Sequence, residues 1–317
     1  MKKLQGIVVS IIGIALAFYL FRQVDREQIF SSLHFFSWKW IAVAFFFYAA
    51  SVVLRALRWQ SMLARHVPLN KMVGVTCIHN FLNHVLPART GELSYVMLLR
   101  QRQNISVSSG TATLIAARLI DLMAMGFFFT ASLFFYWHRI TVPGFRLLLA
   151  TLIAIPICVV LILFLLSRPA SEFYIRHILP KFRSQWFEKC FQFIQNLSSE
   201  LHQIRASGRL RFYLASTFFA WGAKFMAFYC ICKILPLGGA VHFGETILGT
   251  TFSELASTLP IYGFAGIGTV EGGWTLGFTL LGFETASVIA SAFAFHFYIF
   301  CFSLTLASAS FFSMRRK

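Results

Sequence analysis

The chain has 317 residues, of which 58% are hydrophobic and only 12% are charged, and its mean hydropathy is +0.71. A water-soluble domain carries about twice that share of charged residues and could not bury so much apolar surface, including 38 Phe side chains. The composition excludes a soluble enzyme and a disordered chain. It predicts an all-α polytopic membrane protein that forms a single integral membrane domain over residues 1–317.

The formal net charge of +17 would suggest nucleic-acid binding in a soluble protein. In a membrane protein the simpler explanation is that basic loops face the cytoplasm and contact anionic lipid. We therefore expect anionic lipids at the cytoplasmic leaflet and no nucleic-acid partner. The six cysteines fall mostly within apolar runs and lack the spacing of a zinc site or a disulfide framework. They predict small core residues, and we expect no metal and no cofactor.

Six apolar stretches are long enough to cross the hydrocarbon layer, which requires about 20 residues. Lys2 and Lys3 precede the first of them, as in a signal peptide. That stretch ends in bulky aromatic and aliphatic residues rather than at a small-residue cleavage site, which favours an uncleaved helix. The six predicted spans are residues 4–21, 39–57, 110–136, 145–167, 210–235 and 284–312.

The distribution of Lys and Arg predicts the orientation of these spans. With the N-terminus in the cytoplasm, 20 of the 28 basic residues lie on cytoplasmic segments, five lie outside and three lie within spans. Both termini are therefore expected in the cytoplasm, and we expect a protein of the bacterial cytoplasmic (inner) membrane. Residues 168–209 form the one long polar segment, and apolar residues recur there every three or four positions. This pattern predicts an interfacial amphipathic connection on the cytoplasmic side, too short for a catalytic domain.

Two shorter hydrophobic stretches, 72–87 and 244–260, do not fit as simple spans and end at Pro87 and Pro260. In both, a small polar residue (Asn83 or Ser257) stands two or three positions before a Leu-Pro pair, and glycine and then glutamate follow. In the predicted topology the first enters from the cytoplasm and the second from outside. Inverted segments interrupted by Gly and Pro indicate a transporter's binding site. Alternatively the breaks are kinks that help helices to pack. Two breaks of matched pattern favour function, and they bring the prediction to about eight membrane segments.

Ionisable residues within membrane segments are costly and are therefore candidates for the site. Arg118 and Asp121 are three apart on one helical face, and Arg55 and Arg58 have the same spacing. Arg58 either binds ligand or extends its head group to the interface. Lys224 has no partner nearby in the sequence. The candidate substrate-binding residues are Arg55, Arg58, Asn83, Arg89, Glu92, Arg118, Asp121, Glu254, Tyr262, Gly268 and Glu271.

The arginines in this set predict a cationic pocket with glutamates as counter-charges. Arginine is suited to bidentate recognition of phosphate, so the expected ligand is an anionic phospholipid or a lipid-linked phosphate. His296 lies among aromatic residues in the last predicted span, where a core histidine with a satisfied hydrogen bond is the simpler interpretation.

Four motifs in order resemble a known family: residues 55–59 (Arg-Ala-Leu-Arg-Trp), 86–92 (Leu-Pro-Ala-Arg-Thr-Gly-Glu), 117–121 (Ala-Arg-Leu-Ile-Asp) and 266–272 (Gly-Ile-Gly-Thr-Val-Glu-Gly). They are similar to the transmembrane region of lysylphosphatidylglycerol synthases, a flippase-like family. The resemblance covers nearly the whole chain and implies translocation of phospholipids or lipid-linked molecules between leaflets. Some members carry a C-terminal soluble domain that transfers lysine from tRNA to lipid. This chain stops after its last predicted span, so we expect the translocating half alone.

The first hypothesis is therefore a lipid flippase or scramblase, with the head group in a polar cavity at the broken helices. The sequence shows no ATP-binding or catalytic signature. Transport would be downhill or coupled to protons or membrane potential, with Glu92 or Glu271 as candidate proton carriers. One alternative is an integral membrane enzyme that modifies a lipid head group with the same arginines and a carboxylate base. Another is a membrane partner that recruits a lipid-modifying enzyme through residues 168–209.

Overall fold

The computed structural model describes most of the predicted helical segments of the chain. The described residues are 14–20, 22, 37–63, 67–87, 90–136, 199, 202–203, 206–258 and 262–315. Within them the secondary structure is helical and contains no strand. Residues 14–20 of the first predicted span are helical. The predicted span 145–167, nearly all of the amphipathic segment 168–209 and Arg89 lie outside the described residues.

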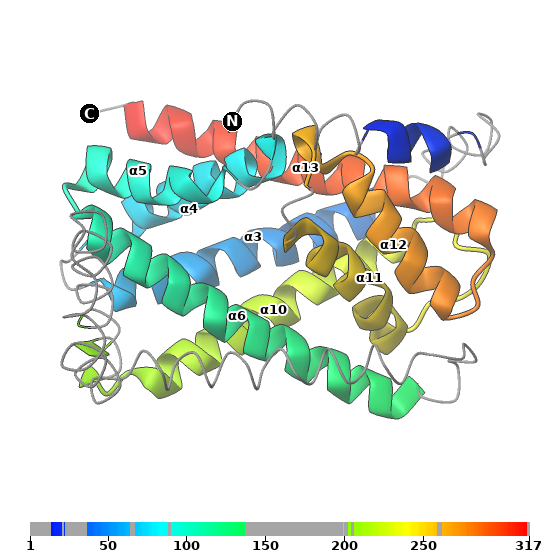
Figure 1. Ribbon diagram of the computed structural model, residues 1–317, viewed down its shortest axis with the longest axis horizontal. Helices are drawn as coiled ribbons and strands as arrows, with labels where there is room; N and C mark the ends of the chain where they lie inside the picture. Colours follow the sequence, from blue (N-terminus) through cyan, green and yellow to red (C-terminus); the bar gives the residue numbers. More distant parts are fainter. Residues whose placement is uncertain are drawn as a thin grey trace, which may run out of the picture.

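Four described helices are long and apolar enough to cross a membrane: α3 (Trp38–Met62), α6 (Val107–Tyr136), α10 (Leu210–Cys232) and α13 (Thr285–Arg315). They confirm the predicted spans 39–57, 110–136, 210–235 and 284–312, and Figure 1 shows them running along the length of the molecule. Large apolar side chains such as Phe46, Phe127, Phe134 and Phe219 lie exposed on their outer faces. On helices long enough to cross a bilayer, such a surface is typical of contact with lipid. The chain is therefore a membrane protein.

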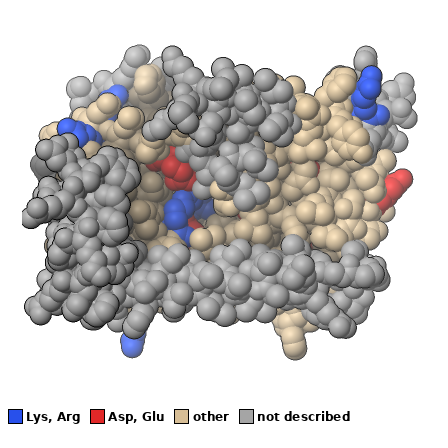
Figure 2. Space-filling view, viewed as in Figure 1, with Lys and Arg blue, Asp and Glu red and all other residues tan. Residues whose placement is uncertain are grey.

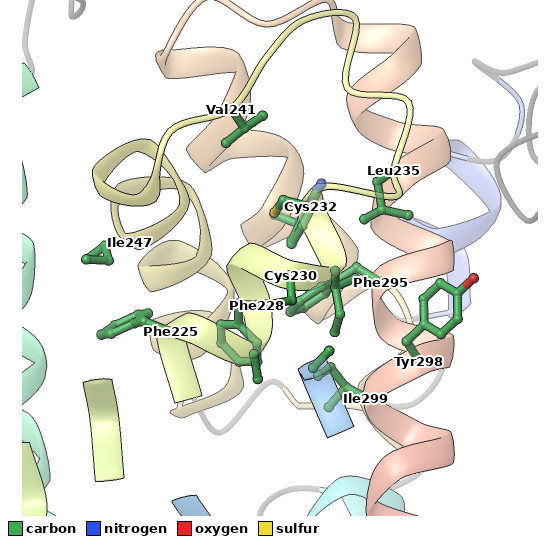
Figure 3. Close-up of a cluster of buried hydrophobic side chains, with 14 of the residues drawn as sticks. Phe225, Phe228, Cys230, Cys232, Leu235, Val241, Ile247, Phe295, Tyr298 and Ile299 are labelled. Carbon is green, nitrogen blue, oxygen red and sulfur yellow. The ribbon is translucent and has the colours of Figure 1, made fainter. Parts of the chain in front are cut away.

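Aromatic packing holds α10, α12 and α13 together. The rings of Phe228 and Phe295 meet edge to face at 5.0 Å, and Phe295 lies 4.1 Å from Trp274, between ring centroids. Figure 3 shows this cluster, which also includes Cys230 and Cys232. Both cysteines are buried, free thiols, as predicted. Because lipid tails are as apolar as the side chains, such close van der Waals contacts hold membrane helices together.

Each of the two short stretches forms the first arm of a helical hairpin. The first hairpin consists of α4 (Leu69–Val85) and α5 (Glu92–Gln103). The second consists of α11 (Phe243–Thr258), the 3-10 turn η4 (Phe264–Gly266) and α12 (Thr269–Leu280). Helices α4 and α11 each stop two residues before a proline, as expected because proline disfavours helical backbone in the residue before it.

Glycine permits the close approach of the arms within each hairpin. A Cβ atom on Gly91 would overlap the backbone of Asn83, at the turn between α4 and α5. A Cβ atom on Gly277 of α12 would overlap the backbone of Gly249 of α11. A larger residue at either position would push the arms apart.

The turns of the two hairpins meet inside the molecule. In Figure 1, α4 and α5 occupy the left half, and α11 and α12 occupy the right half. The Tyr262 hydroxyl, in the second turn, donates a hydrogen bond of 3.1 Å to the carbonyl oxygen of His84, near the end of α4. Two segments 178 residues apart thus join at the level where both leave their helical conformation.

Candidate functional site

A cavity of about 80 Å³ lies beside the point where the hairpin turns meet. It has space for a few water molecules. Polar side chains predominate in its wall, although it lies among apolar helices. The lining residues are Tyr48, Ser51, Arg55, Asn80, Asn83, His84, Arg118, Lys224, Phe228, Ser253, Glu254, Ser257, Tyr262, Val270, Phe295, His296 and Ile299.

Three cations from three long helices line the cavity: Arg55 of α3, Arg118 of α6 and Lys224 of α10. Arg118 binds Glu92 through both ends of its guanidinium group, with Nη2 2.7 Å from Oε1 and Nε 3.3 Å from Oε2. Lys224 Nζ lies 2.6 Å from Glu254 Oε2. Figure 2 shows acidic and basic side chains together at the floor of a hollow in the surface.

Arg55 differs from the other two cations. Its guanidinium carbon lies 5.4 Å from the centre of the Trp221 ring, and within the described chain it forms no ion pair with a carboxylate. Its buried Nε atom has no hydrogen-bond partner there either. Among the lining residues three cations therefore face one carboxylate, Glu254, while Glu92, Asp121 and Glu271 lie behind the wall. The excess positive charge makes the cavity complementary to an anion.

Arg58 and Asp121 do not line the cavity. Arg58 is fully buried, and its Nη1 and Nη2 atoms lie 2.7 and 3.1 Å from the two carboxylate oxygens of Asp121. Thr217 accepts a further hydrogen bond from Arg58 at 2.7 Å, and Trp221 Nε1 donates to Asp121 at 3.0 Å. This pair joins α3, α6 and α10 in the interior. Arg118 Nη1 also lies 3.8 Å from Asp121 Oδ2. These two residues, three positions apart in the sequence, therefore lie farther from each other than each lies from its main partner.

The glutamate of the fourth motif, Glu271, caps the N-terminus of α12. Glu271 Oε2 accepts a hydrogen bond of 2.7 Å from the backbone N–H of Gly268, whose φ of 83° is accessible to glycine. Glu271 Oε1 lies 2.7 Å from Nδ1 of His296 on α13. Glu271 is buried and does not line the cavity, whereas His296 does.

Two further predicted residues, Asn83 and Tyr262, line the cavity. Asn83 Nδ2 lies 3.4 Å from Glu92 Oε1, at the limit of a hydrogen bond. His79 is also close to Glu92: its Nε2 atom lies 4.0 Å from Oε2 and its Nδ1 atom 3.1 Å from Ser94 Oγ. His79 and Ser94 are buried and do not line the cavity, so neither offers a nucleophile to a ligand there.

Sequence reasoning left Lys224 and His296 out of the binding set. Each carried a signal, because an ionisable residue in a membrane segment is a candidate for function by default. On α4 and α11 the faces that reach the cavity carry Ser and Asn residues three or four positions apart. That spacing is also common on helices that only pack against others, so it did not single out these residues. The lining residues missed in this way are Asn80, His84, Ser253 and Ser257. Among the described residues no group of His, Cys, Asp and Glu is arranged to hold a metal ion.

Comparison with known proteins agrees with the motifs. Residues 4–307 match the family model described as the lysylphosphatidylglycerol synthase TM region. The chain is also similar to the UPF0104 membrane protein PH1989 of Pyrococcus horikoshii, with 25% identity over 303 residues, which are 88% of each chain. Because the family model spans nearly the whole sequence, the chain belongs to the lysylphosphatidylglycerol synthase transmembrane family.

Proposed function

We propose that this member of the family moves lipids with an anionic head group between the leaflets of a membrane, as a flippase or scramblase. The head group enters the cavity between the hairpin turns while the lipid tails remain in the bilayer. The observation that carries this proposal is the excess of positive charge at a polar cavity, where Arg55 has no carboxylate partner within the described chain.

The charge balance favours a phosphate or phosphodiester over a neutral or cationic group. A guanidinium group binds phosphate oxygens in a bidentate manner, and such charge-assisted hydrogen bonds contribute about 1.5–3 kcal/mol each. An anion beside Arg55 would neutralise the one cavity-lining cation that forms no ion pair with a carboxylate among the described residues. The ligand then completes the electrostatic balance of the site.

The two hairpins supply elements that can move. In the proposed topology they are inverted, re-entrant segments that enter from opposite sides of the membrane and meet at mid-depth. Each is tied to a long helix by one ion pair at the cavity: Arg118 holds Glu92 of the first hairpin, and Lys224 holds Glu254 of the second. An entering phosphate competes with both carboxylates for their cations, so ligand binding would loosen both ties.

The size of the cavity indicates a closed arrangement. At about 80 Å³ it is far below the roughly 300–1,000 Å³ of sites that hold whole small molecules. A whole head group would therefore fit only after the cavity widens, which separation of the hairpin turns would allow. Release of the two ion pairs by the anion explains how the ligand itself would drive that opening.

Reconstitution of the purified chain into liposomes tests this function. Fluorescent phosphatidylglycerol is distributed over both leaflets, and a quencher that cannot cross the membrane reports how fast inner-leaflet lipid becomes accessible. We expect Arg55→Gln to slow flipping at least about tenfold, because one charged hydrogen bond is worth that factor or more. Arg55 has no ion pair in the described structure to lose, so we expect the substitution to remove only its contact with Trp221 and to leave the fold intact.

Arg102→Gln serves as the matched control, since Arg102 is exposed on α5 and does not line the cavity. Equal flipping by the Arg55 variant and this control would eliminate the proposed site, and no flipping of anionic lipid would count against the function. Formation of a modified lipid would favour the enzymatic alternative. Co-purification of a lipid-modifying enzyme without flipping would favour the recruiting partner.

The proposal includes a location and an orientation. The excess of Lys and Arg on one set of segments favours cytoplasmic N- and C-termini, and the composition suits a bacterial inner membrane. The proposed partners are the transported lipid and anionic lipid at the cytoplasmic surface. A cysteine-labelling experiment at the two termini of intact cells and inverted vesicles would test the orientation.

A further inference from the structure

His296 combines a fixed side chain with a position in the wall of the cavity. Its Nδ1 atom lies 2.7 Å from Glu271 Oε1, and the residue lines the cavity. The other oxygen of Glu271 accepts the backbone N–H of Gly268 at the start of α12. The carboxylate is thus held by two groups from different segments, and the imidazole ring is held by the carboxylate.

This arrangement selects the proton position on the ring. A carboxylate oxygen only accepts hydrogen bonds, so the proton of the neutral imidazole lies on Nδ1. Nε2 is then left with its lone pair, and the hydrogen bond that His296 forms among the described residues is the one at Nδ1. A proton from water converts Nε2 into a donor and adds a positive charge to the wall of the cavity.

We infer that His296 is a proton-binding residue of the cavity and that a proton and the anionic head group bind there together. The inference rests on the proposed function, because it assigns the ion that accompanies the same ligand. Protonated Nε2 would donate a hydrogen bond to an anionic oxygen of the head group. Glu271 positions the ring and is not itself in contact with the ligand.

The charged and titratable groups around His296 come from every element packed against α13. Cations Arg55 and Lys224 lie on α3 and α10, and His84 lies on α4. These three share the cavity with the following further groups: Arg118 on α6, Glu254 on α11, Tyr48 on α3 and Tyr262 in the second turn. Glu271 approaches from α12.

Because these charged groups share one cavity, proton binding and anion binding affect each other. An anion and a proton attract each other across the cavity whatever the proton affinity of the ring alone. If the anion favours proton binding, the proton must favour anion binding by the same factor. Translocation of an anionic lipid would therefore carry a proton with it and respond to a proton gradient.

Calorimetry with the full chain in detergent micelles and dihexanoyl phosphatidylglycerol as the probe tests the inference. Titrations in two buffers of different ionisation enthalpy report the number of protons taken up per lipid bound. For the wild type we expect net proton uptake when the lipid binds, and affinity about tenfold higher at the acidic end of the titrated range. His296→Gln should still bind the lipid but lose both the uptake and the pH dependence.

Two variants separate coupling from structure. Glu271→Gln can still accept the Gly268 N–H, but its amide donates to Nδ1 and shifts the ring proton to Nε2, so proton uptake should be lost while binding remains. His242→Gln removes an exposed histidine outside the cavity and should match the wild type. Binding without proton uptake by the wild type, or unchanged uptake by His296→Gln, would overturn the coupling alone. Absence of binding at every pH would instead overturn the proposed function.

Discussion

Two layers of charge lie one helical turn apart on the same three helices, and they have different characters. The interior layer consists of Arg58, Asp121, Thr217 and Trp221. The cavity layer consists of Arg55, Arg118 and Lys224 with their carboxylates. On α3 and α6 the residues of the two layers are three positions apart, at 55 and 58 and at 118 and 121.

The difference lies in balance and access. In the interior layer one cation meets one anion in bidentate geometry, neighbours complete the hydrogen bonds, and Arg58 is fully buried. In the cavity layer the cations outnumber the carboxylates, and the Arg118 side chain remains 32% exposed. A balanced, inaccessible pair holds helices together, whereas an unbalanced, accessible group can bind a ligand. Similar residues at neighbouring positions thus have different roles.

Replacement of a carboxylate by its amide in each layer is the strongest test of this comparison. Asp121→Asn removes the carboxylate that pairs with buried Arg58 in the described chain, and we expect a loss of about 3–5 kcal/mol in the free energy of unfolding. Chemical or thermal unfolding in detergent would measure it. Stability within about 0.5 kcal/mol of the wild type would show that the interior pair does not hold the helices together.

Glu92→Gln makes the matching change in the cavity layer. Because Arg118 is partly exposed, we expect a loss of at most about 1 kcal/mol in stability. Arg118 would at the same time be freed for the ligand, so phosphatidylglycerol should bind a few-fold more tightly in the calorimetric titration. Weaker binding would contradict the competition between ligand and carboxylate.

The smallest expected effect concerns the contact between the hairpin turns. Tyr262→Phe removes the hydrogen bond to the His84 carbonyl and should destabilise the closed arrangement by about 1 kcal/mol. The liposome assay should then show flipping faster by about twofold to fivefold. Tyr95→Phe is the control, since its buried hydroxyl has no hydrogen-bond partner in the described chain. If both variants behave alike, this contact does not restrain opening.

Much of the fold could be predicted from local sequence. Four predicted spans coincide with long helices, and the helices before Pro87 and Pro260 stop near the predicted positions. These features depend on hydrophobic length and on the backbone limits of proline and glycine, which are properties of a short segment. The prediction of two special breaks likewise needed only the local pattern.

The candidate site was only partly predictable. Asn83, Arg118, Glu254 and Tyr262 lie at the cavity with Arg55, whereas Arg58 and Asp121 lie in the interior layer and Glu271 behind His296. A spacing of three residues places two side chains on the same broad face of a helix, so periodicity could not separate the layers. The partner of Lys224, thirty residues along the chain at Glu254, was equally beyond local reasoning.

By itself the sequence determined that this is a membrane protein. It also determined the positions of most of the spans and of the two breaks in the helices. Each of these outcomes follows from the transfer of short segments out of water and from local backbone sterics. Only the tertiary structure decided which charges are balanced and which face the cavity. The pairs join residues 26, 30 and 63 positions apart, and their partners are selected by how the helices pack. Function in this protein therefore depends on packing between segments whose positions local chemistry had already set.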